Sequence, residues 1–190
     1  MNIIAGIARG VKLDVHKGLG VRPTGVMARK SLFDSLRTFD NFVVVDLFAG
    51  TGALGLEAAS RCAAEVYFVE NSKSNCKIIS NNITKVKRAG VFTDMLVVCS
   101  DVGEASHRLE DLSGKIDIIF ADPPYDEAAS FADKIFADRK FASWAGQSLF
   151  IFETPFEGSR RPDFEKNSLW NVKNRRKLGQ SVFYFLRVGE

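Results

Sequence analysis

The sequence predicts one α/β domain whose core is a mostly parallel, doubly wound sheet. From residue 42 onward, short apolar runs alternate with segments of helical spacing, as in chains built from βαβ units. The runs are continuously apolar rather than alternating, so both faces of each strand are expected to be buried. The chain has 190 residues, of which 46% are hydrophobic, and this is enough for one such core.

Residues 1–40 are predicted to form an N-terminal extension of this domain, and residues 41–190 its core. The segments NIIAGIARG and VKLDV look like two short strands that turn near Gly10. The segment VMARKSLFDSL, residues 26–36, has the spacing of a helix. The extension is therefore expected to be a β-hairpin followed by a helix.

Strands and helices are predicted in alternation between residues 42 and 153. β-Branched and aromatic residues fill the strand segments, which are too short for helices: 42–48, 65–70, 95–100, 115–121 and 148–153. The helical segments between them are 53–62, 72–90, 102–112 and 126–140. In the second helical segment, Ser72 is suited to cap the start and Gly90 to supply a left-handed stop.

The last part of the chain breaks this alternation and predicts an antiparallel hairpin. The strand-like segments 169–178 and 181–188 are joined by Gly179 and Gln180 alone. Because this connection leaves no room for a crossover helix, the two strands are expected to pair with each other at one edge of the sheet.

The net charge of +3 is spread unevenly along the chain. Cations exceed acids by seven to two in residues 1–37, by five to none in residues 71–90, and by seven to two in residues 159–177, so the remainder is net acidic. Clustered cations suggest a polyanion that is met on particular faces. The alternative is an ordinary solvated surface, which we favour for residues 71–90 because they read as a helix exterior.

Several classes of protein are not expected from the composition. No apolar run reaches the ~20 residues of a membrane span, and the first residues lack the apolar centre of a signal peptide. The three cysteines, Cys62, Cys76 and Cys99, form no CxxC motif, and His16 and His107 lie far apart in the chain. We therefore expect a soluble cytoplasmic protein with no metal site and no disulfide framework.

A glycine-rich turn follows the first predicted core strand. Gly50, Gly52 and Gly55 spell GxGxxG between a strand and a helix, where glycines let the backbone approach a ligand at the helix N-terminus. Glu70 ends the second strand, where a carboxylate can accept both hydroxyls of a ribose. These features alone would also suit a dinucleotide enzyme.

Asp46 favours S-adenosylmethionine over a dinucleotide as the ligand of this turn. A carboxylate at the strand tip would repel a pyrophosphate but attract an ammonium group, and S-adenosylmethionine carries an amino-acid head, a sulfonium cation and no phosphate. Asp101 follows the third strand, placed either to meet the adenine edge or to cap the next helix. The predicted cofactor-binding residues are Asp46, Phe48, Gly50, Gly52, Glu70, Asp101 and Val102.

The stretch ADPPYDE predicts the reacting site. Asp122, Pro123, Pro124 and Tyr125 follow the fourth strand, at the end of a parallel sheet where such folds bind ligands. If Asp122 and the Pro123 carbonyl accept the two hydrogens of an exocyclic amine while Tyr125 stacks on the base, the nitrogen is held in line with a sulfonium methyl. A paired or stacked nucleotide would first have to be flipped out. The alternative is a turn that ends the strand, with Asp122 capping the next helix.

With both motifs in place, the sequence resembles the RsmD family of bacterial methyltransferases, which methylate guanine N2 in small-subunit (16S) ribosomal RNA. The resemblance rests on NIIAGIARGVKL, GVRPTGVMARKSLFDSL, DLFAGTGALGLEAASR, ADPPYD and KLGQSVFYFL. It implies a Rossmann-like class I methyltransferase fold with seven strands, S-adenosylmethionine as the methyl donor, and RNA within a ribosomal subunit or assembly intermediate as the partner. Adenine and cytosine amino-methyltransferases share the glycine loop and DPPY, so the N-terminal segments carry the likeness to this family.

The N-terminal extension is expected to bind RNA through Arg9, Lys12, Arg22 and Arg29. Arg22 and Arg29 match the family pattern, and we expect them to bind phosphates, with structural salt bridges as the alternative. Val26, Met27, Lys30 and Leu178 stand where family members usually carry an acid, an arginine, a glutamate and often a tyrosine. These departures concern RNA docking rather than the predicted catalytic residues.

The resulting hypothesis is S-adenosylmethionine-dependent methylation of guanine N2 in small-subunit rRNA by a monomer that needs no metal or membrane. One alternative is a DNA adenine-N6 methyltransferase, which shares the catalytic motif but normally carries a target-recognition insertion. Another is an RNA-binding ribosome-assembly protein without catalysis, which would have no need of Asp122.

Overall fold

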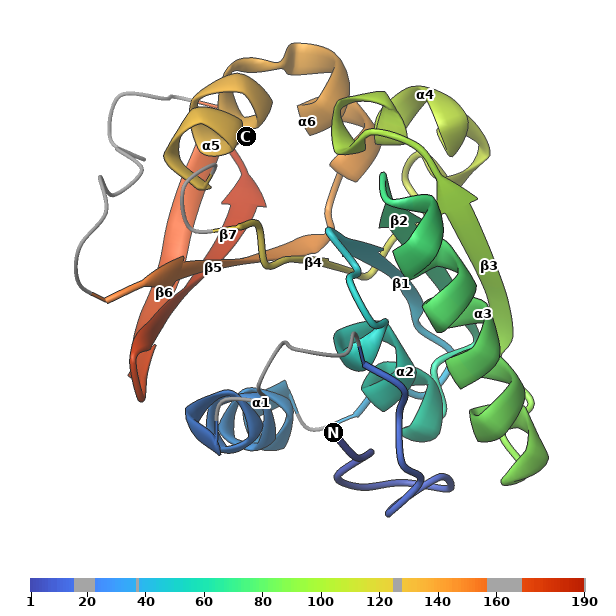
Figure 1. Cartoon of the computed structure of the whole chain (residues 1–190). Coiled ribbons are helices and arrows are strands. Elements are labelled where there is room, and N and C mark those ends of the chain that lie inside the picture. Colours follow the sequence, from blue (N-terminus) through green and yellow to red (C-terminus); the bar gives the residue numbers. More distant parts are fainter. Residues whose placement is uncertain (16–22, 37, 125–127, 157–168, 190) are drawn as a thin grey trace.

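A seven-stranded sheet runs through the molecule, with helices on both of its faces (Figure 1). The computed structural model describes residues 1–15, 23–36, 38–124, 128–156 and 169–189. The strands lie in the order β3-β2-β1-β4-β5-β7-β6. They are β1 (Val43–Leu47), β2 (Glu65–Glu70), β3 (Asp94–Cys99), β4 (Ile118–Ala121), β5 (Leu149–Pro155), β6 (Trp170–Leu178) and β7 (Ser181–Val188). The predicted fold class is confirmed.

The first five strands are parallel, and their order reverses between β1 and β4. Every residue of β4 is buried, as are four of the five in β1, which explains why these segments are continuously apolar. Asp46 is the one polar residue of β1, and its carboxyl is buried like its apolar neighbours. A polar residue in such a strand costs free energy, so its position needs a separate explanation.

The C-terminal hairpin is antiparallel, as expected, and places β7 beside β5 with β6 at the edge of the sheet. Gly179, at a φ of 66°, and Gln180 form the turn between Leu178 and Ser181. The register shifts between Val172 and Asn174, which are paired with consecutive residues of β7, so one extra residue bulges from the edge strand.

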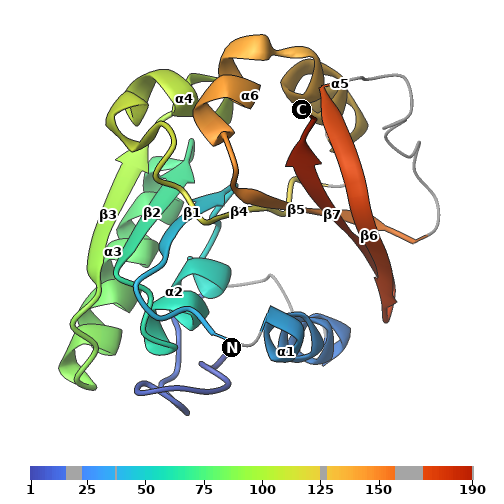
Figure 2. The same cartoon turned by 180° about the vertical axis from the view of Figure 1, so that it is seen from behind.

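The helices form two layers, each with its own apolar cluster against the sheet. One layer contains α1 (Pro23–Leu36), α2 (Ala53–Ser60) and α3 (Lys73–Arg88), and the other contains η1 (Val102–Glu104), α4 (Ala105–Arg108), η2 (Glu110–Leu112), α5 (Ala128–Ala137) and α6 (Arg139–Ala145) (Figure 2). In the described part of the chain, no helix combines the length and apolarity needed to cross a membrane.

Two predicted helices are divided in the structure. The segment 102–112 forms three short turns, and Leu109 leaves the helical conformation where its carbonyl accepts the indole N–H of Trp144 at 2.7 Å. The segment 126–140 ends at Asp138, whose side chain accepts the N–H groups of Lys140 and Phe141 and so starts α6. In both places a side-chain hydrogen bond outweighs the helical periodicity.

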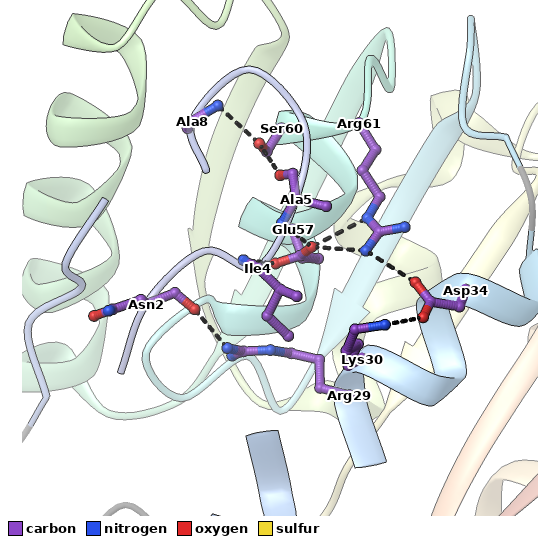
Figure 3. A network of polar contacts seen from close by, with 10 residues as sticks. All are labelled: Asn2, Ile4, Ala5, Ala8, Arg29, Lys30, Asp34, Glu57, Ser60 and Arg61. Carbon is purple, nitrogen blue, oxygen red and sulfur yellow. Dashed lines mark hydrogen bonds and ion pairs between the residues drawn. The ribbon is translucent and has the colours of Figure 1, made fainter. Parts of the chain in front are cut away.

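The predicted N-terminal hairpin is present in a short form: Asn2 and Lys12 make an antiparallel bridge, and the N–H groups of Ile3 and Leu13 donate to the carbonyls of Val11 and Met1. Between these two residues, side chains of α2 accept the N–H groups of Ile4, Ala5 and Ala8 (Figure 3). The carboxylate of Glu57 accepts the N–H groups of Ile4 and Ala5 at 2.8 and 3.0 Å. Because these N–H groups bind to α2, the pairing does not extend into a regular two-stranded ladder.

Gly6 permits this close approach of the N-terminal segment to α2. Its φ is 80°, and a Cβ atom added there would lie 1.8 Å from the carbonyl oxygen of Ser60. The same serine accepts the N–H of Ala8 through its hydroxyl and donates to the carbonyl of Ala5. Since Met1 lines the cleft described below, this attachment also fixes one wall of the site.

We expect Gly6→Ala to destabilise the protein more than Gly10→Ala. Both glycines have positive φ, so each substitution should cost about 1–2 kcal/mol for left-handed backbone. Only Gly6 has atoms within 4 Å of the added methyl, and relief of that overlap should cost about 1–3 kcal/mol more. Urea unfolding monitored by circular dichroism measures both losses, and equal losses would contradict the packing described for Gly6.

Candidate active site

A cleft of about 730 Å³ opens at the carboxyl ends of the parallel strands, where the strand order reverses. Ligands of open α/β sheets bind at this position. The loops that follow β1, β2 and β4, the end of β5, the β6–β7 turn and the N-terminus all contribute to its lining. Of the predicted site residues, the cleft brings together Asp46, Phe48, Gly50, Glu70, Asp122, Pro123 and Pro124.

The glycine loop turns sharply from β1 into α2. Phe48, Gly50 and Gly52 all have positive φ, at 57°, 57° and 78°. Phe48 adopts this conformation although it carries a Cβ, and its ring packs edge-on against Phe131 with centroids 4.5 Å apart. Left-handed backbone at a bulky residue is strained, and such strain is concentrated in ligand-binding loops.

The three glycines of the motif have different structural roles. Gly50 lines the cleft, whereas Gly52 is buried beneath it and does not. Gly55 lies against β2, where an added Cβ would be 2.4 Å from a ring carbon of Phe68. The first glycine thus leaves backbone open to a ligand, and the other two let α2 pack closely against the sheet.

The carboxylate of Glu70 ties the glycine loop to the end of β2. One oxygen accepts the N–H of Gly50 at 2.8 Å, and the other accepts the N–H of Ser72 at 2.9 Å. Each carboxylate oxygen can accept a second hydrogen bond. Glu70 therefore holds the loop in place and retains acceptor capacity toward the cleft that it lines.

The buried carboxyl of Asp46 accepts the N–H of Gly55 at 2.8 Å. It thereby fixes the start of α2 to the tip of β1, which explains an acid in an apolar strand. Burial raises the pKa of Asp46 to about 8; the hydrogen bond from Gly55 opposes the rise, and the charges of Asp122 and Glu70 add to it. Most Asp46 side chains are therefore neutral at pH 7 in the free protein.

Asp122, Pro123 and Pro124 form one wall of the cleft, and Tyr125 lies outside the described residues. The carbonyl of Pro124 accepts the N–H of Ala128 at 3.0 Å, whereas the carbonyl of Pro123 accepts no hydrogen bond from the described residues. Asp122 is open to solvent from the cleft, yet the surrounding protein atoms disfavour its charge and raise its pKa to about 6. An acid and a carbonyl without a donor among the described residues thus lie side by side.

Glu153 is a site residue that the sequence reasoning missed. Ala121 and Phe152 are partners on β4 and β5, so Asp122 and Glu153 follow them at neighbouring strand positions. Burial raises the pKa of Glu153 well above its ordinary value; the charge of Asp122 adds to the rise, and a hydrogen bond with Ser181 opposes it. An acid at the carboxyl end of a predicted parallel strand was the available signal.

The cleft lining is strongly acidic. Asp46, Glu70, Asp122 and Glu153 line it, and no Lys or Arg is among its described lining residues. Over the described parts of the chain, no group of three or more His, Cys, Asp or Glu side chains has an arrangement that could hold a metal ion. The chemistry of this lining is suited to an organic ligand that carries positive charge.

Asp101 and Val102, both predicted cofactor contacts, do not line the cleft. The Asp101 side chain accepts the N–H of Gly103 at 2.8 Å, which is the capping alternative considered from the sequence. Val102 is buried in the apolar cluster beneath α4. The other lining residues that the sequence reasoning missed include Met1, Ser72, Asn75, Gln180 and Ser181.

Arg29 was predicted to bind RNA, and the structure corrects this prediction because its side chain is buried. Arg29 is 6% exposed and donates a hydrogen bond to the carbonyl of Asn2 at 2.7 Å, as Figure 3 shows. It joins α1 to the N-terminal segment, so its role is structural. Arg9 and Lys12 are exposed, and Arg22 lies outside the described residues.

Comparison with known proteins identifies a family. The profile of the family described as "Conserved hypothetical protein 95" matches residues 1–187. Ribosomal RNA small subunit methyltransferase D of Haemophilus influenzae is 32% identical over 126 residues, which cover 66% of this chain and 64% of that protein. The protein of the same name in Escherichia coli K12 is 35% identical over 126 residues, covering 66% and 60%. The alignments thus span less than two thirds of these two relatives.

Solved structures share the whole architecture. The Escherichia coli protein yhhF is 28% identical, with a TM-score of 0.69, and the match covers 100% of this chain and 98% of that one. The ribosomal protein L11 methylase of Lactobacillus delbrueckii subsp. bulgaricus, at 15% identity, covers 96% and 87% with a TM-score of 0.67. SMU.776, solved in complex with SAH, is 18% identical and covers 91% and 52% with a TM-score of 0.68. The latter two matches, both under 25% identical, show a likeness of fold alone. By its near full-length profile match, the chain belongs to the family described as Conserved hypothetical protein 95, the RsmD family that its motifs resemble.

Proposed function

We propose that this protein transfers a methyl group from S-adenosylmethionine to the exocyclic N2 amine of a guanine in small-subunit rRNA. The observation that carries the proposal is the meeting of the Asp122–Pro124 wall and the Gly50 loop in one acidic cleft. Relatives named as small-subunit rRNA methyltransferases support the substrate class. The choice of guanine rests on the resemblance to the RsmD family.

The residues present fit S-adenosylmethionine. This donor has a sulfonium and an ammonium against one carboxylate, so its net positive charge complements the acidic lining. Glu70 would accept the ribose hydroxyls, as the remaining acceptor capacity of its oxygens allows, and the Gly50 loop would lie along the amino-acid end. Phe48 offers an apolar wall, and Asp46 offers a carboxyl that ionises beside a cation.

The catalytic proposal assigns separate tasks to Asp122 and Pro123. The amine of guanine is a poor nucleophile because its lone pair is delocalised into the ring. The Asp122 carboxylate and the Pro123 carbonyl accept its two hydrogens, which holds the nitrogen in line with the sulfonium methyl. As the N–C bond forms, the C–S bond breaks with its electron pair on sulfur, and the amine proton passes to Asp122.

The decisive experiment uses labelled S-adenosylmethionine and small ribosomal subunits from cells that lack this modification. We expect one labelled guanine, with the methyl on N2, when the rRNA is digested and mapped by mass spectrometry. Protein-free 16S rRNA and double-stranded DNA serve as comparison substrates. Label on adenine, or on DNA alone, would support the adenine-N6 alternative and overturn the proposal.

Asp122→Asn should reduce turnover by roughly 10²–10⁴-fold, because an amide is a far weaker acceptor and no proton acceptor. The dissociation constant for S-adenosylmethionine should stay within a few-fold. Asp117→Asn is the matched control, since Asp117 precedes the same strand at its other end and accepts the N–H of Val43. Similar activity loss in both variants would show that the effect is not specific to the cleft acid.

Binding of S-adenosylmethionine at pH 7 should release protons. The raised pKa of Asp46, about 8, means that this carboxyl is mostly protonated at pH 7, and a bound cation lowers the pKa and drives ionisation. Calorimetric titrations in buffers of different ionisation enthalpy measure the protons released. The release should shrink toward pH 9, where Asp46 is already ionised, and should be smaller at pH 7 in Asp46→Asn. A binding enthalpy independent of buffer at pH 7 would contradict this account.

A further inference from the structure

The edge strand β6 is a cationic surface that the cleft does not explain. Its residues from Asn171 to Lys177 are all exposed, and four of them are basic: Lys173, Arg175, Arg176 and Lys177. The strand lies at the opposite edge of the sheet from β3 (Figure 2). Among the strands of the described residues, none pairs with its outer side.

The charges of β6 are not neutralised by the part of the protein that the structure describes. No described carboxylate lies within ion-pair distance of its four cations, although other surface cations, such as Lys30 and Lys85, have such partners. The β6 cations instead lie over aromatic rings: Arg175 over Tyr184, Arg176 over Phe185 and Lys177 over Phe156. Rings position a cation without cancelling its charge, so all three remain available to an anion.

These cations extend over both faces of the strand. Tyr184 belongs to the apolar cluster beneath α5, and Phe185 to the cluster beneath α1. Arg175 and Arg176 therefore occupy opposite faces of the same edge. The bulge at Lys173 adds a further exposed cation outside the regular pairing.

Protection of an edge strand against aggregation is the simpler explanation, because charged residues discourage pairing with another chain. Charges of either sign would provide that protection. Between Leu169 and Gly189, however, the described chain contains five cations, the four named and Arg187, and no acid. A run of one sign favours a polyanion as the partner.

The cationic strand leads directly to the cleft. Lys177 pairs with Val182, and the turn between them includes Gln180 and Ser181, which line the cleft. We propose that β6 docks the phosphate backbone of the RNA substrate and that the β6–β7 turn is the point where the target nucleotide leaves this backbone for the cleft. This inference rests on the proposed function, and it moves the principal RNA contact away from the buried Arg29.

The test compares two triple variants that remove the same charge. One carries Arg175→Gln, Arg176→Gln and Lys177→Gln on β6. The control carries Lys77→Gln, Lys87→Gln and Arg88→Gln, exposed positions of α3, which lies beside β3 at the other edge of the sheet (Figure 1). A third variant, Arg175→Lys with Arg176→Lys, keeps the charge and alters the packing on the rings.

Methylation of unmodified small subunits and binding of protein-free 16S rRNA are measured over a range of KCl concentrations. The β6 triple variant should raise KM for RNA by roughly tenfold or more and lower the slope of log Kd against log salt by about 2, as expected when three phosphate contacts are lost. The α3 control and the double lysine variant should keep the wild-type slope. Turnover at saturating RNA and the dissociation constant for S-adenosylmethionine should be unchanged in all three.

Two results would overturn the docking inference while wild-type methylation of rRNA holds. Equal weakening of RNA binding by the β6 and α3 variants would show that only total charge matters. Loss of turnover at saturating RNA, with KM unchanged, would place β6 in the chemical step instead. Absence of rRNA methylation by the wild-type protein would instead refute the proposed function, so the two failures are distinguishable.

Discussion

The meeting of four carboxyl groups in one cleft, with no cation among the described lining residues, is the constraint on which the site depends. Parallel strands bring their carboxyl ends to a common edge, and four of these ends or their following loops supply an acid: Asp46, Glu70, Asp122 and Glu153. Burial raises the pKa values of Asp46 and Glu153, and the charge of neighbouring acids adds to the rise. Without a cation among the described lining residues, the arrangement is most stable with a positively charged ligand in place.

The fold and seven of the residues that line the cleft could be predicted because their signals are local. Continuous apolar runs marked the parallel strands, and GxGxxG and DPPY marked two of the loops at their ends. Glu153 and Ser181 were missed because they meet Asp122 only through the pairing of β4, β5 and β7. Such neighbours follow from sheet order, which a single sequence does not contain.

The N-terminal segment shows where local patterns mislead. Its sequence has strand-like character, yet the buried carboxylate of Glu57, paired with Arg61, binds its N–H groups from a helix more than fifty residues away. The same network explains why Arg29 is structural, although a basic residue near the start of a helix suggests a phosphate site. The sequence sign of this network was Glu57, the one charged residue in the otherwise small and apolar sequence of α2.

The separation of the acidic cleft from the cationic edge strand has a consequence for which part of a nucleotide can enter the cleft. If RNA docks as proposed, the carboxyls of the cleft would repel its phosphates and the cations of β6 would attract them, so the sugar–phosphate chain would be held at the rim. A nucleobase carries no negative charge, and the amine N–H groups of guanine are donors for the carboxyl and carbonyl oxygens of the cleft. Under that proposal the surface potential would favour entry of the base and keep its sugar–phosphate backbone outside the cleft.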